Sequence, residues 1–344
     1  MKKTPESTTL LYSELQQQCV AILPVDKGVS YSTKKVNGHK YWYLELTVGN
    51  RTKAMSLGPD SDELRQQIET QKKLVEQSKE SVANRQRLVA MLAKGGAACP
   101  SVTEARVLEV LERAGIFLAG GVIIGSNAFV TYSNLLGVQW PSAMMKTQDM
   151  DIAGASHIPV AVSRSDKPIV DVLKESGMSF FAVPALSPKT PSTMYRLHNQ
   201  EYLIDLVTPM LGATSSRPVF LKNIKTFAEP LRFLDYLLED IMPAVVVAKA
   251  GIMINVPDPA RFALHKLVVA IRRPPHQQLK AEKDRTQSEL LLTVLLETRP
   301  GDVLLAMDAA KTMPSKFIQQ LREGLNYIDD DIKNACLSLL DNDS

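Results

Sequence analysis

Two aspartates separated by one residue are the side chains of this sequence best suited to chemistry. Asp149 and Asp151 lie in the run Gln148-Asp149-Met150-Asp151-Ile152. In a β-strand every second side chain points the same way, so the two carboxylates share one face while Met150 and Ile152 occupy the opposite, packed face. Two carboxylates this close favour a divalent cation. The alternative is an exposed edge strand that carries two solvated acids.

A glycine turn precedes this pair and a third aspartate follows it. The apolar run from Gly120 to Ile124 ends in Gly125-Ser126, and the later strand-like segment Tyr202 to Thr208 carries Asp205. The apolar neighbours of Asp205 favour a packed strand, and the alternative is an outward-facing acid on a hairpin. The order is therefore a glycine-serine turn, a pair of aspartates and a single aspartate.

In this order the three motifs resemble those of the polymerase-β-like nucleotidyltransferase superfamily. The most similar group is a bacterial family described only by its nucleotidyltransferase fold, which shares the stretch Gly120 to Pro209 and a later helical segment like Val256 to Leu267. Ser126 and Asp149 are further apart here than is usual in the superfamily. We interpret the extra residues as a longer helix plus a loop, and the alternative is that another glycine turn plays this part.

The resemblance implies a magnesium-dependent reaction on a nucleoside triphosphate. Asp149 and Asp151 would hold two Mg²⁺ ions, with Mn²⁺ as a substitute, because hard cations prefer oxygen ligands. Asp205 would ligate the catalytic metal and help to deprotonate an acceptor hydroxyl. Gly125 would let the backbone approach the phosphates, and the Ser126 hydroxyl and nearby amides would donate hydrogen bonds to them.

Basic residues near the C-terminus could reach the triphosphate. By the same resemblance, Lys266, Lys280 and Lys283 would act as point charges on it. A surface helix with charge pairs four residues apart explains the run from Lys280 to Arg285 equally well. His265 has apolar neighbours, which is typical of a core histidine and not of a catalytic base.

A small basic sheet is predicted near the N-terminus. Residues Ser30 to Gly58 read as a three-stranded meander with a type I′ turn at Asn37-Gly38. Lysine, arginine and aromatic residues alternate in it, which suits nucleic-acid binding, and the alternative is a sheet that needs its aromatics for packing. These residues are Lys34, Lys35, Lys40, Tyr41, Trp42, Tyr43, Arg51 and Lys53. The polar stretch Ser61 to Ala93 is either one long helix or a helical hairpin.

The remaining pattern predicts an α+β fold with a mixed sheet, flanking helices and a helical C-terminal unit. Ser101 and Glu104 form a capping box that opens a helix. Predicted strands are Ile116–Ala119, Val122–Ile124, Asp149–Ala153, Phe180–Val183, Met194–His198, Glu201–Val207, Val245–Val247 and Ile252–Asn255. Predicted helices are Ala128–Leu136, Phe227–Leu238, one from Pro257 through Ile271, Gln287–Glu297 and Pro314–Tyr327. The predicted units are a β-sheet module (1–60), a helical linker (61–114), a nucleotidyltransferase core (115–215) and a mainly helical domain (216–344).

Composition narrows the class of protein further. The 344 residues are 45% hydrophobic, carry a net charge of +3 and contain three widely spaced cysteines, which favours a reducing cytoplasm over a disulfide or zinc framework. The N-terminus lacks the apolar segment of a signal peptide, and the longest apolar run is interrupted by Pro243, Lys249 and Gly251, so no membrane segment is expected. Neither a Rossmann nor a P-loop glycine motif occurs. Nothing in the sequence points to a particular oligomeric state.

Two hypotheses follow from these patterns. The first is a nucleotidyltransferase that moves a nucleoside monophosphate from a triphosphate to a hydroxyl. Its acceptor is expected to be RNA, such as a tRNA end, because of the basic aromatic sheet, and a protein hydroxyl is left open. The second is a non-catalytic nucleic-acid-binding or regulatory protein that keeps the nucleotidyltransferase fold.

Overall fold

Three parallel strands form the centre of the largest sheet. The computed structural model describes residues 2–20, 29–36, 39–48, 51–145, 149–155, 168–185, 187, 189–212 and 217–341. In it, β7 (Asp149–Ala153) is parallel to β10 (Leu203–Pro209), which is parallel to β12 (Thr226–Leu231). The strands paired antiparallel to these or to one another are β5 (Val122–Ile124), β8 (Phe180–Ala182), β9 (Met194–Leu197) and β11 (Val219–Leu221). The sheet is therefore mixed, as predicted.

Alternation of polar and apolar residues explains why β7 and β10 occupy the centre. Met150, Ile152 and Ile204 have no exposed surface, and Leu206 has almost none. These side chains alternate with the aspartates along their strands, so one face of each strand packs against the core. The predicted packed face opposite Asp149 and Asp151 is confirmed.

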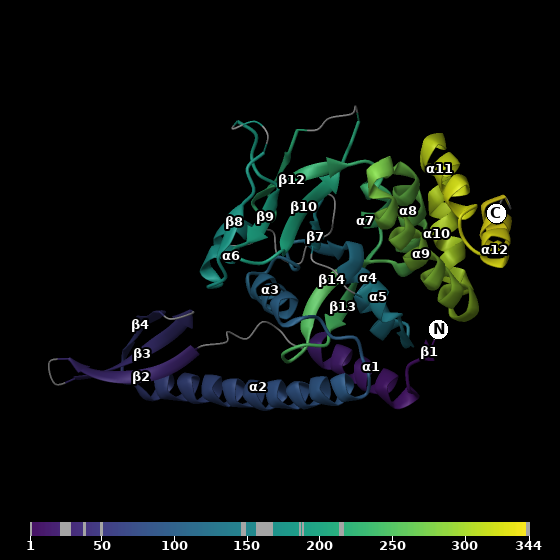
Figure 1. The fold of residues 1–344 in the computed structure, drawn as a ribbon. Helices are drawn as coiled ribbons and strands as arrows, with labels where there is room; N and C mark the ends of the chain where they lie inside the picture. The colour runs from purple at the N-terminus through teal and green to yellow at the C-terminus, as the bar shows by residue number, and fades with distance from the viewer. Residues whose placement is uncertain are drawn as a thin grey trace.

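Helices cover the sheet and continue beyond it (Figure 1). The capping box of α3 (Val102–Arg113) is confirmed, because the Glu104 amide donates to Ser101 Oγ and the Ser101 amide donates to Glu104 Oε2. The other helices near the sheet are α4 (Gly125–Leu135), α5 (Ser142–Met145), α6 (Ile169–Glu175) and α7 (Leu234–Leu238), and the short strand β6 (Val138–Gln139) follows α4.

A β-hairpin leads into the helical C-terminal part. Strands β13 (Ile241–Val246) and β14 (Ile252–Pro257) pair antiparallel and are followed by α8 (Pro259–Arg272). Asp258 caps α8 by accepting hydrogen bonds from the amides of Ala260 and Arg261. The elements that follow are the 3₁₀ turn Pro275–Gln277, α9 (Gln278–Thr298), α10 (Pro300–Lys311), α11 (Ser315–Leu325) and α12 (Asp330–Asp341). The α+β fold with a helical C-terminal part is confirmed.

The N-terminal region forms a separate sheet carried on a long helix. Strand β1 (Lys2–Lys3) pairs with β6, and α1 (Glu6–Val20) follows it. Strands β2 (Val29–Val36), β3 (His39–Val48) and β4 (Arg51–Pro59) form a three-stranded antiparallel sheet. The polar stretch after it is the single helix α2 (Asp62–Lys94), which runs from this sheet back to α1 (Figure 1). The three strands of the predicted meander are confirmed, and its predicted turn at Asn37-Gly38 lies outside the described residues. The helical-hairpin alternative for α2 is wrong.

Two predicted elements are wrong. Ile116–Ala119 forms turns and not a strand, because Gly115 and Gly120 have positive φ and Asn255 Nδ2 donates to the carbonyls of Phe117 and Gly121. An apolar run is compatible with a buried strand and with a buried turn, so the apolar pattern could not distinguish these two structures. Phe227–Leu238 is not one helix, since its first part is β12, where Pro230 would interrupt a helix, and only α7 is helical. Among the described residues, no helix is both long and apolar enough to cross a membrane.

Arg85 anchors α2 to the rest of the protein. Its side chain is almost fully buried, and Nε donates to the carbonyl oxygen of Ala250 at 2.9 Å. Ala250 lies in the turn of the β13–β14 hairpin, where Gly251 has a φ of 80° and its Cα faces Cys19 of α1. Helices α1 and α2 therefore meet the hairpin at the same turn.

We expect Arg85→Ala to lower the free energy of unfolding by about 1–3 kcal/mol, because the buried Ala250 carbonyl then keeps only the weak thiol donor of Cys19. The measurement is urea unfolding of the full-length protein followed by circular dichroism. Arg87→Ala is the matched control, since Arg87 is exposed on the same helix and its loss is expected to stay within about 0.5 kcal/mol. Equal losses in the two variants would contradict an anchoring role for Arg85.

Candidate active site

Asp151 and Asp205 lie side by side on neighbouring parallel strands. The register of β7 and β10 pairs Asp151 with Asp205 and Asp149 with Leu203. Since Asp149 and Asp151 are two residues apart, all three carboxylates come from the same face of the sheet. Each of the three aspartates is partly buried. The structure thus brings together the paired and the single aspartate, which are 54 residues apart at their closest in the sequence.

The three aspartates form one cluster of negative charge. Burial, together with the negative charges of Asp149 and Asp205, raises the pKa of Asp151 to about 7. Burial also raises the pKa of Asp205 to about 6, helped by the charges of Asp149 and Glu229. Glu229 lies on β12. Its place in the sheet was not predicted, because residues 227–238 were expected to form a helix.

Gly125 leaves room for the Asp151 carboxylate. Ile124 is the register partner of Asp151, and Gly125 follows it with a φ of 62° at the start of α4. A Cβ atom on Gly125 would lie 2.1 Å from Asp151 Oδ2. A side chain at this position would therefore overlap the carboxylate, and Gly125-Ser126 forms the helix-opening turn that the sequence predicted.

The long segment between Ser126 and Asp149 holds most of α4, followed by β6 and α5, and residues 146–148 lie outside the described residues. The expected helix is present, and the expected loop contains a short strand and a short helix. Asn127, on the first turn of α4, donates from Nδ2 to the backbone carbonyl of Asp149 at 2.9 Å. The start of α4 is thus fastened directly to the first residue of β7, which was not predicted.

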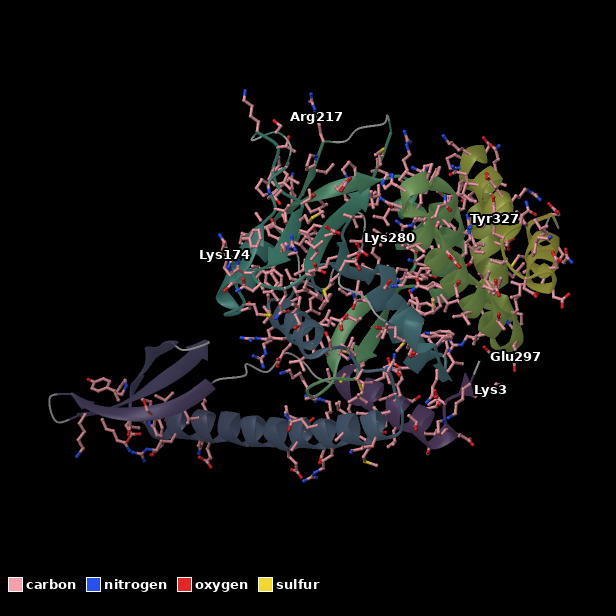
Figure 2. The ribbon with its side chains drawn as sticks, viewed as in Figure 1. Lys3, Lys174, Arg217, Lys280, Glu297 and Tyr327 are labelled. Carbon is pink, nitrogen blue, oxygen red and sulfur yellow. The ribbon has the colours of Figure 1, made fainter. Side chains whose placement is uncertain are left out.

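Two lysines of α9 face the acidic cluster. Lys280 Nζ lies 3.9 Å from Asp149 Oδ2, and Figure 2 shows Lys280 between the central sheet and the C-terminal helices. Burial lowers the pKa of Lys283, the charge of Lys266 lowers it further, and the charge of Asp149 opposes this. The helix therefore places positive charge beside the carboxylates, and contact of these lysines with a triphosphate stays a prediction.

Lys266 is held by a buried ion pair that the sequence did not reveal. Its Nζ lies 2.6 Å from Asp284 Oδ1, and Arg273 Nε lies 2.5 Å from Asp284 Oδ2. Only 4% of the Asp284 side chain is exposed. The charge of Lys266 also acts on Asp151. Asp284 thus holds Lys266 of α8 and Arg273, the residue that directly follows α8. Of these two, Lys266 lies near the acidic cluster.

His265 is a core residue. It is buried in α8, and burial lowers its pKa to about 3, assisted by the neighbouring positive charge of Lys266. The side chain is therefore neutral at pH 7, in agreement with the predicted core histidine.

The donor atoms at this site fit a hard divalent cation. All three acidic side chains offer only oxygen, the ligand atom that Mg²⁺ prefers, and the space at Gly125 adjoins Asp151 Oδ2. Within the residues that the structure describes, no three His, Cys, Asp or Glu side chains are already arranged around a metal position. The metal therefore remains a proposal based on donor chemistry and on the shared face.

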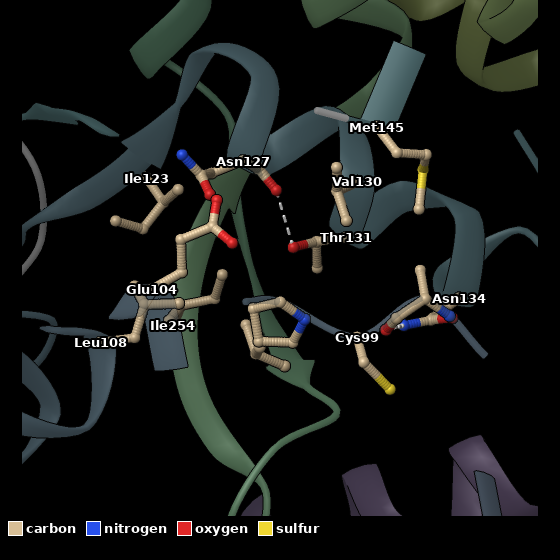
Figure 3. Close-up of a pocket in the computed structure, with 13 residues that line it drawn as sticks. Cys99, Glu104, Leu108, Ile123, Asn127, Val130, Thr131, Asn134, Met145 and Ile254 are labelled. Atoms are coloured by element: carbon tan, nitrogen blue, oxygen red, sulfur yellow. Dashed lines mark hydrogen bonds between the residues drawn. The ribbon is translucent and has the colours of Figure 1, made fainter. Parts of the chain in front are cut away.

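A small cavity lies behind the start of α4 and not over the carboxylates. Its volume is about 50 Å³ and its lining includes Cys99, Glu104, Asn127 and Thr131. Figure 3 shows Glu104 and Asn127 pointing toward one another, with Cys99 at the other end. A drug-sized ligand needs about 300 Å³ or more, so the cavity is too small for a nucleotide and has room for water only.

Comparison with known families agrees with this geometry. The sequence matches a nucleotidyltransferase family over residues 103–312, which is more than half of the chain and includes all three aspartates. The chain belongs to this nucleotidyltransferase family. Its general reaction is therefore nucleotidyl transfer, and the resemblance inferred from the three motifs is confirmed. No curated protein and no solved structure matches the sequence.

The space at Gly125 can be tested against a second glycine of this nucleotidyltransferase. Gly115 also has a positive φ, but an added Cβ there meets no atom within 4 Å. We expect Gly115→Ala to lower the free energy of unfolding by about 1–2 kcal/mol, the cost of an alanine in a left-handed conformation. Gly125→Ala should lower the free energy of unfolding by the same amount and by about 1–3 kcal/mol more, because the added Cβ overlaps the Asp151 carboxylate. Urea unfolding of both variants measures the difference, and equal losses would mean that Asp151 does not depend on Gly125.

We expect Asp284→Asn to lower the free energy of unfolding by about 3–5 kcal/mol at pH 7, because Lys266 and Arg273 keep their buried charges without a partner. The positive charges of Lys266 and Arg273 lower the pKa of Asp284 below its ordinary 3.8, against the effect of burial. The carboxylate therefore stabilises the fold above that pH, and the difference from the wild type should shrink below it.

Asp330→Asn is the control for Asp284→Asn. Asp330 also lies 2.6 Å from a lysine, Lys333, but its side chain is 83% exposed. The same change of charge should therefore have little effect on unfolding there. A similar loss in both variants would show that burial of the Asp284 pair is not what matters.

Proposed function

We propose that this protein transfers a nucleoside monophosphate from a nucleoside triphosphate to an acceptor hydroxyl and releases pyrophosphate. The observation that supports this most directly is the register that sets Asp205 beside Asp151, with Asp149 on the same face. Membership of the nucleotidyltransferase family gives the reaction class. RNA is the acceptor that we favour, and a protein hydroxyl is the alternative.

Asp149, Asp151 and Asp205 would hold the magnesium ions. When bound, two such ions supply the positive charge that stabilises both the attacking and the leaving oxygen of an in-line displacement. The acceptor oxygen forms a bond to the α-phosphorus while the bond from that phosphorus to the bridging oxygen of pyrophosphate breaks. The proton of the hydroxyl passes to Asp205, and pyrophosphate leaves with the bonding electron pair.

The start of α4 and the lysines of α9 would bind the triphosphate. Amides at the beginning of a helix, together with the Ser126 hydroxyl, donate hydrogen bonds to phosphate oxygens. Lys280 and Lys283 lie beside the acidic cluster and would neutralise the phosphate charge. Lys266 would contribute from its buried position, where Asp284 holds it.

The test is transfer of label from each α-labelled nucleoside triphosphate to total RNA or to lysate protein in the presence of Mg²⁺. We expect Asp151→Asn to reduce transfer at least about a hundredfold, because several kcal/mol of transition-state stabilisation are lost with the metal. In metal-free buffer the same variant should unfold at a temperature no lower than the wild type, because repulsion among the three acids is relieved.

Asp171→Asn is the control, since Asp171 is an exposed acid on α6 and its loss should leave transfer unchanged. Chelation of divalent ions should stop the reaction, and Mn²⁺ should restore it. Transfer that persists in the Asp149, Asp151 and Asp205 variants would refute the proposed site. Absence of transfer with every triphosphate would instead favour the non-catalytic, nucleic-acid-binding alternative.

A further inference from the structure

The sheet face that carries the aspartates continues onto β9 and β8. In the register of the strands, Asp149 is paired with Leu203 of β10, and Leu203 is paired with Arg196 of β9. Arg196 is in turn paired with Phe181 of β8. Register partners point to the same face of a sheet, so these four side chains form one row that runs from the acids to β8. Figure 1 shows the same order of strands, with β8 furthest from β7.

The outer part of this row is open to solvent. Phe181 is 43% exposed, and Arg196 and His198 are also exposed. Tyr195 and Leu197, which alternate with Arg196 and His198 along the chain, are buried in the core, so the exposed side chains belong to the face that carries the acids. The ring of His198 meets that of Phe181 edge to face, with centroids 6.1 Å apart. Among the described residues, no carboxylate pairs with Arg196. We call Phe181, Arg196 and His198 the β8–β9 surface.

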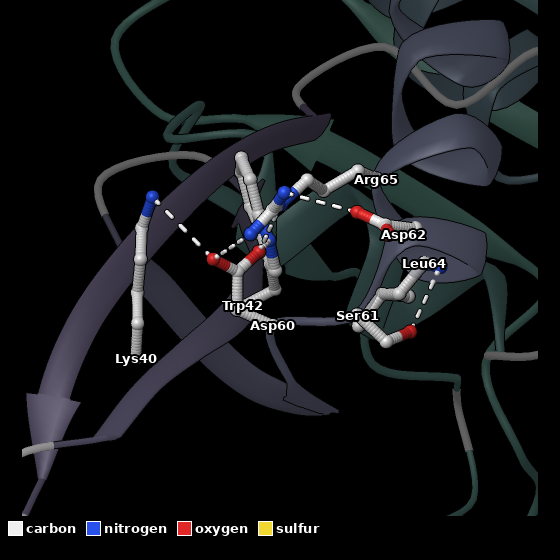
Figure 4. Close-up of polar contacts among 7 residues, drawn as sticks. All are labelled: Lys40, Trp42, Asp60, Ser61, Asp62, Leu64 and Arg65. Atoms are coloured by element: carbon white, nitrogen blue, oxygen red, sulfur yellow. Dashed lines mark hydrogen bonds and ion pairs between the residues drawn. The ribbon is translucent and has the colours of Figure 1, made fainter.

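The N-terminal sheet does not present a comparable surface in its described residues. Trp42 Nε1 donates to Asp60 Oδ1 at 2.7 Å, and Arg65 of α2 donates to both oxygens of Asp60 (Figure 4). Lys40 Nζ lies 3.8 Å from Asp60 Oδ2. Tyr41 comes from the opposite face by strand alternation. Lys40 and Trp42 therefore belong to the junction with α2, and binding of nucleic acid by this sheet stays a prediction.

The β8–β9 surface and the glycine turn lie on opposite sides of the acids. Strand β5, which leads into Gly125, pairs with β7 on the side away from β10. Strand β9 pairs with β10 on the side away from β7, and Asp205 is the aspartate of β10. If the triphosphate occupies the glycine turn, the side of Asp205 toward β9 is left for the molecule that supplies the hydroxyl.

We propose that the β8–β9 surface binds the acceptor as a single strand of nucleic acid whose terminal hydroxyl lies at Asp205. Proteins hold such strands by stacking bases on phenylalanine or histidine rings and by neutralising phosphates with cations, and this surface offers both on one face. Diagonal neighbours on adjacent strands are about 7–8 Å apart, which sets Arg196 close to the nucleotide that ends at Asp205. The position of the hydroxyl rests on the proposed transferase function, whereas binding of the strand does not.

The experiment measures binding of a fluorescent single-stranded oligonucleotide, as RNA and as DNA, to the full-length protein by anisotropy. Mg²⁺ is present and nucleoside triphosphate is left out, so no transfer takes place. We expect Phe181→Ala to weaken binding about 5- to 150-fold, the range for loss of one stacked base. Phe181→Trp keeps a ring and should bind like the wild type. Tyr327→Ala is the control, because Tyr327 is a 54% exposed aromatic residue between α11 and α12.

Arg196 is tested through its charge. At constant Mg²⁺, Arg196→Gln should weaken binding and reduce the slope of log affinity against log salt by at most about 0.7, which is one phosphate contact on a single strand. Arg196→Lys keeps the charge and should keep the slope. Arg87→Gln is the control, since Arg87 is an exposed arginine of α2. Thermal unfolding followed by circular dichroism checks the fold, so weaker binding at an unchanged Tm is assigned to the β8–β9 surface.

Three results of these measurements would overturn the proposal: no binding of either oligonucleotide by the wild type at low salt, equal affinities of Phe181→Ala and Tyr327→Ala, or transfer of label to protein and not to nucleic acid. Binding of RNA, DNA or both supports it, and the ratio identifies the strand. Where transfer is observed, Phe181→Ala should raise the KM for the strand, and a rise in the KM for the triphosphate alone would also contradict the proposal. Because binding is measured without transfer, a failure of this proposal is distinguished from a failure of the proposed function.

Discussion

The register between β7 and β10 is the constraint on which the candidate site depends. Asp205 faces Asp151 only because each strand places its apolar side chains on the core face and its acids on the other. A slip of one residue would bury the carboxylates and expose Met150, Ile152, Ile204 and Leu206. Burying each of these apolar side chains contributes roughly 1.5–3 kcal/mol. The core thus specifies the register and offsets the repulsion among the acids.

A second charge arrangement, on the helical side, complements the first. Asp284 pairs with Lys266 and Arg273 in a buried position, and α9 carries Lys280 and Lys283 toward the acids. Helices α8 and α9 pack along each other, and Ser288 Oγ donates to the Ala263 carbonyl between them. Negative charge therefore comes from the sheet and positive charge from the helices, which suits a ligand that contains both metal ions and phosphates.

The sequence predicts the parts of this site that depend on local periodicity. Alternation predicted the shared face of Asp149 and Asp151, and the capping box at Ser101 and Glu104 predicted the start of α3. Contacts between distant residues could not be predicted in this way. The Asp284 ion pair, the bond from Asn127 to the Asp149 carbonyl and the place of Glu229 in the sheet all depend on packing of elements far apart in the chain. The error at Ile116–Ala119 has the same origin, since Asn255 of β14 satisfies carbonyls in this turn region.

The β13–β14 hairpin joins these separate parts mechanically. Its turn accepts the hydrogen bond from Arg85 of α2, and Tyr12 of α1 donates to the carbonyl of Val245 in β13. Strand β14 contacts β5, which leads into Gly125, and it is followed directly by Asp258 and α8, which carries Lys266. The hairpin therefore contacts α1, α2 and the strand that leads into the glycine turn, and it connects directly to the helix that carries Lys266. Because a hairpin with both strands packed in the core deforms little, the glycine turn and Lys266 are held in a fixed relation to one another.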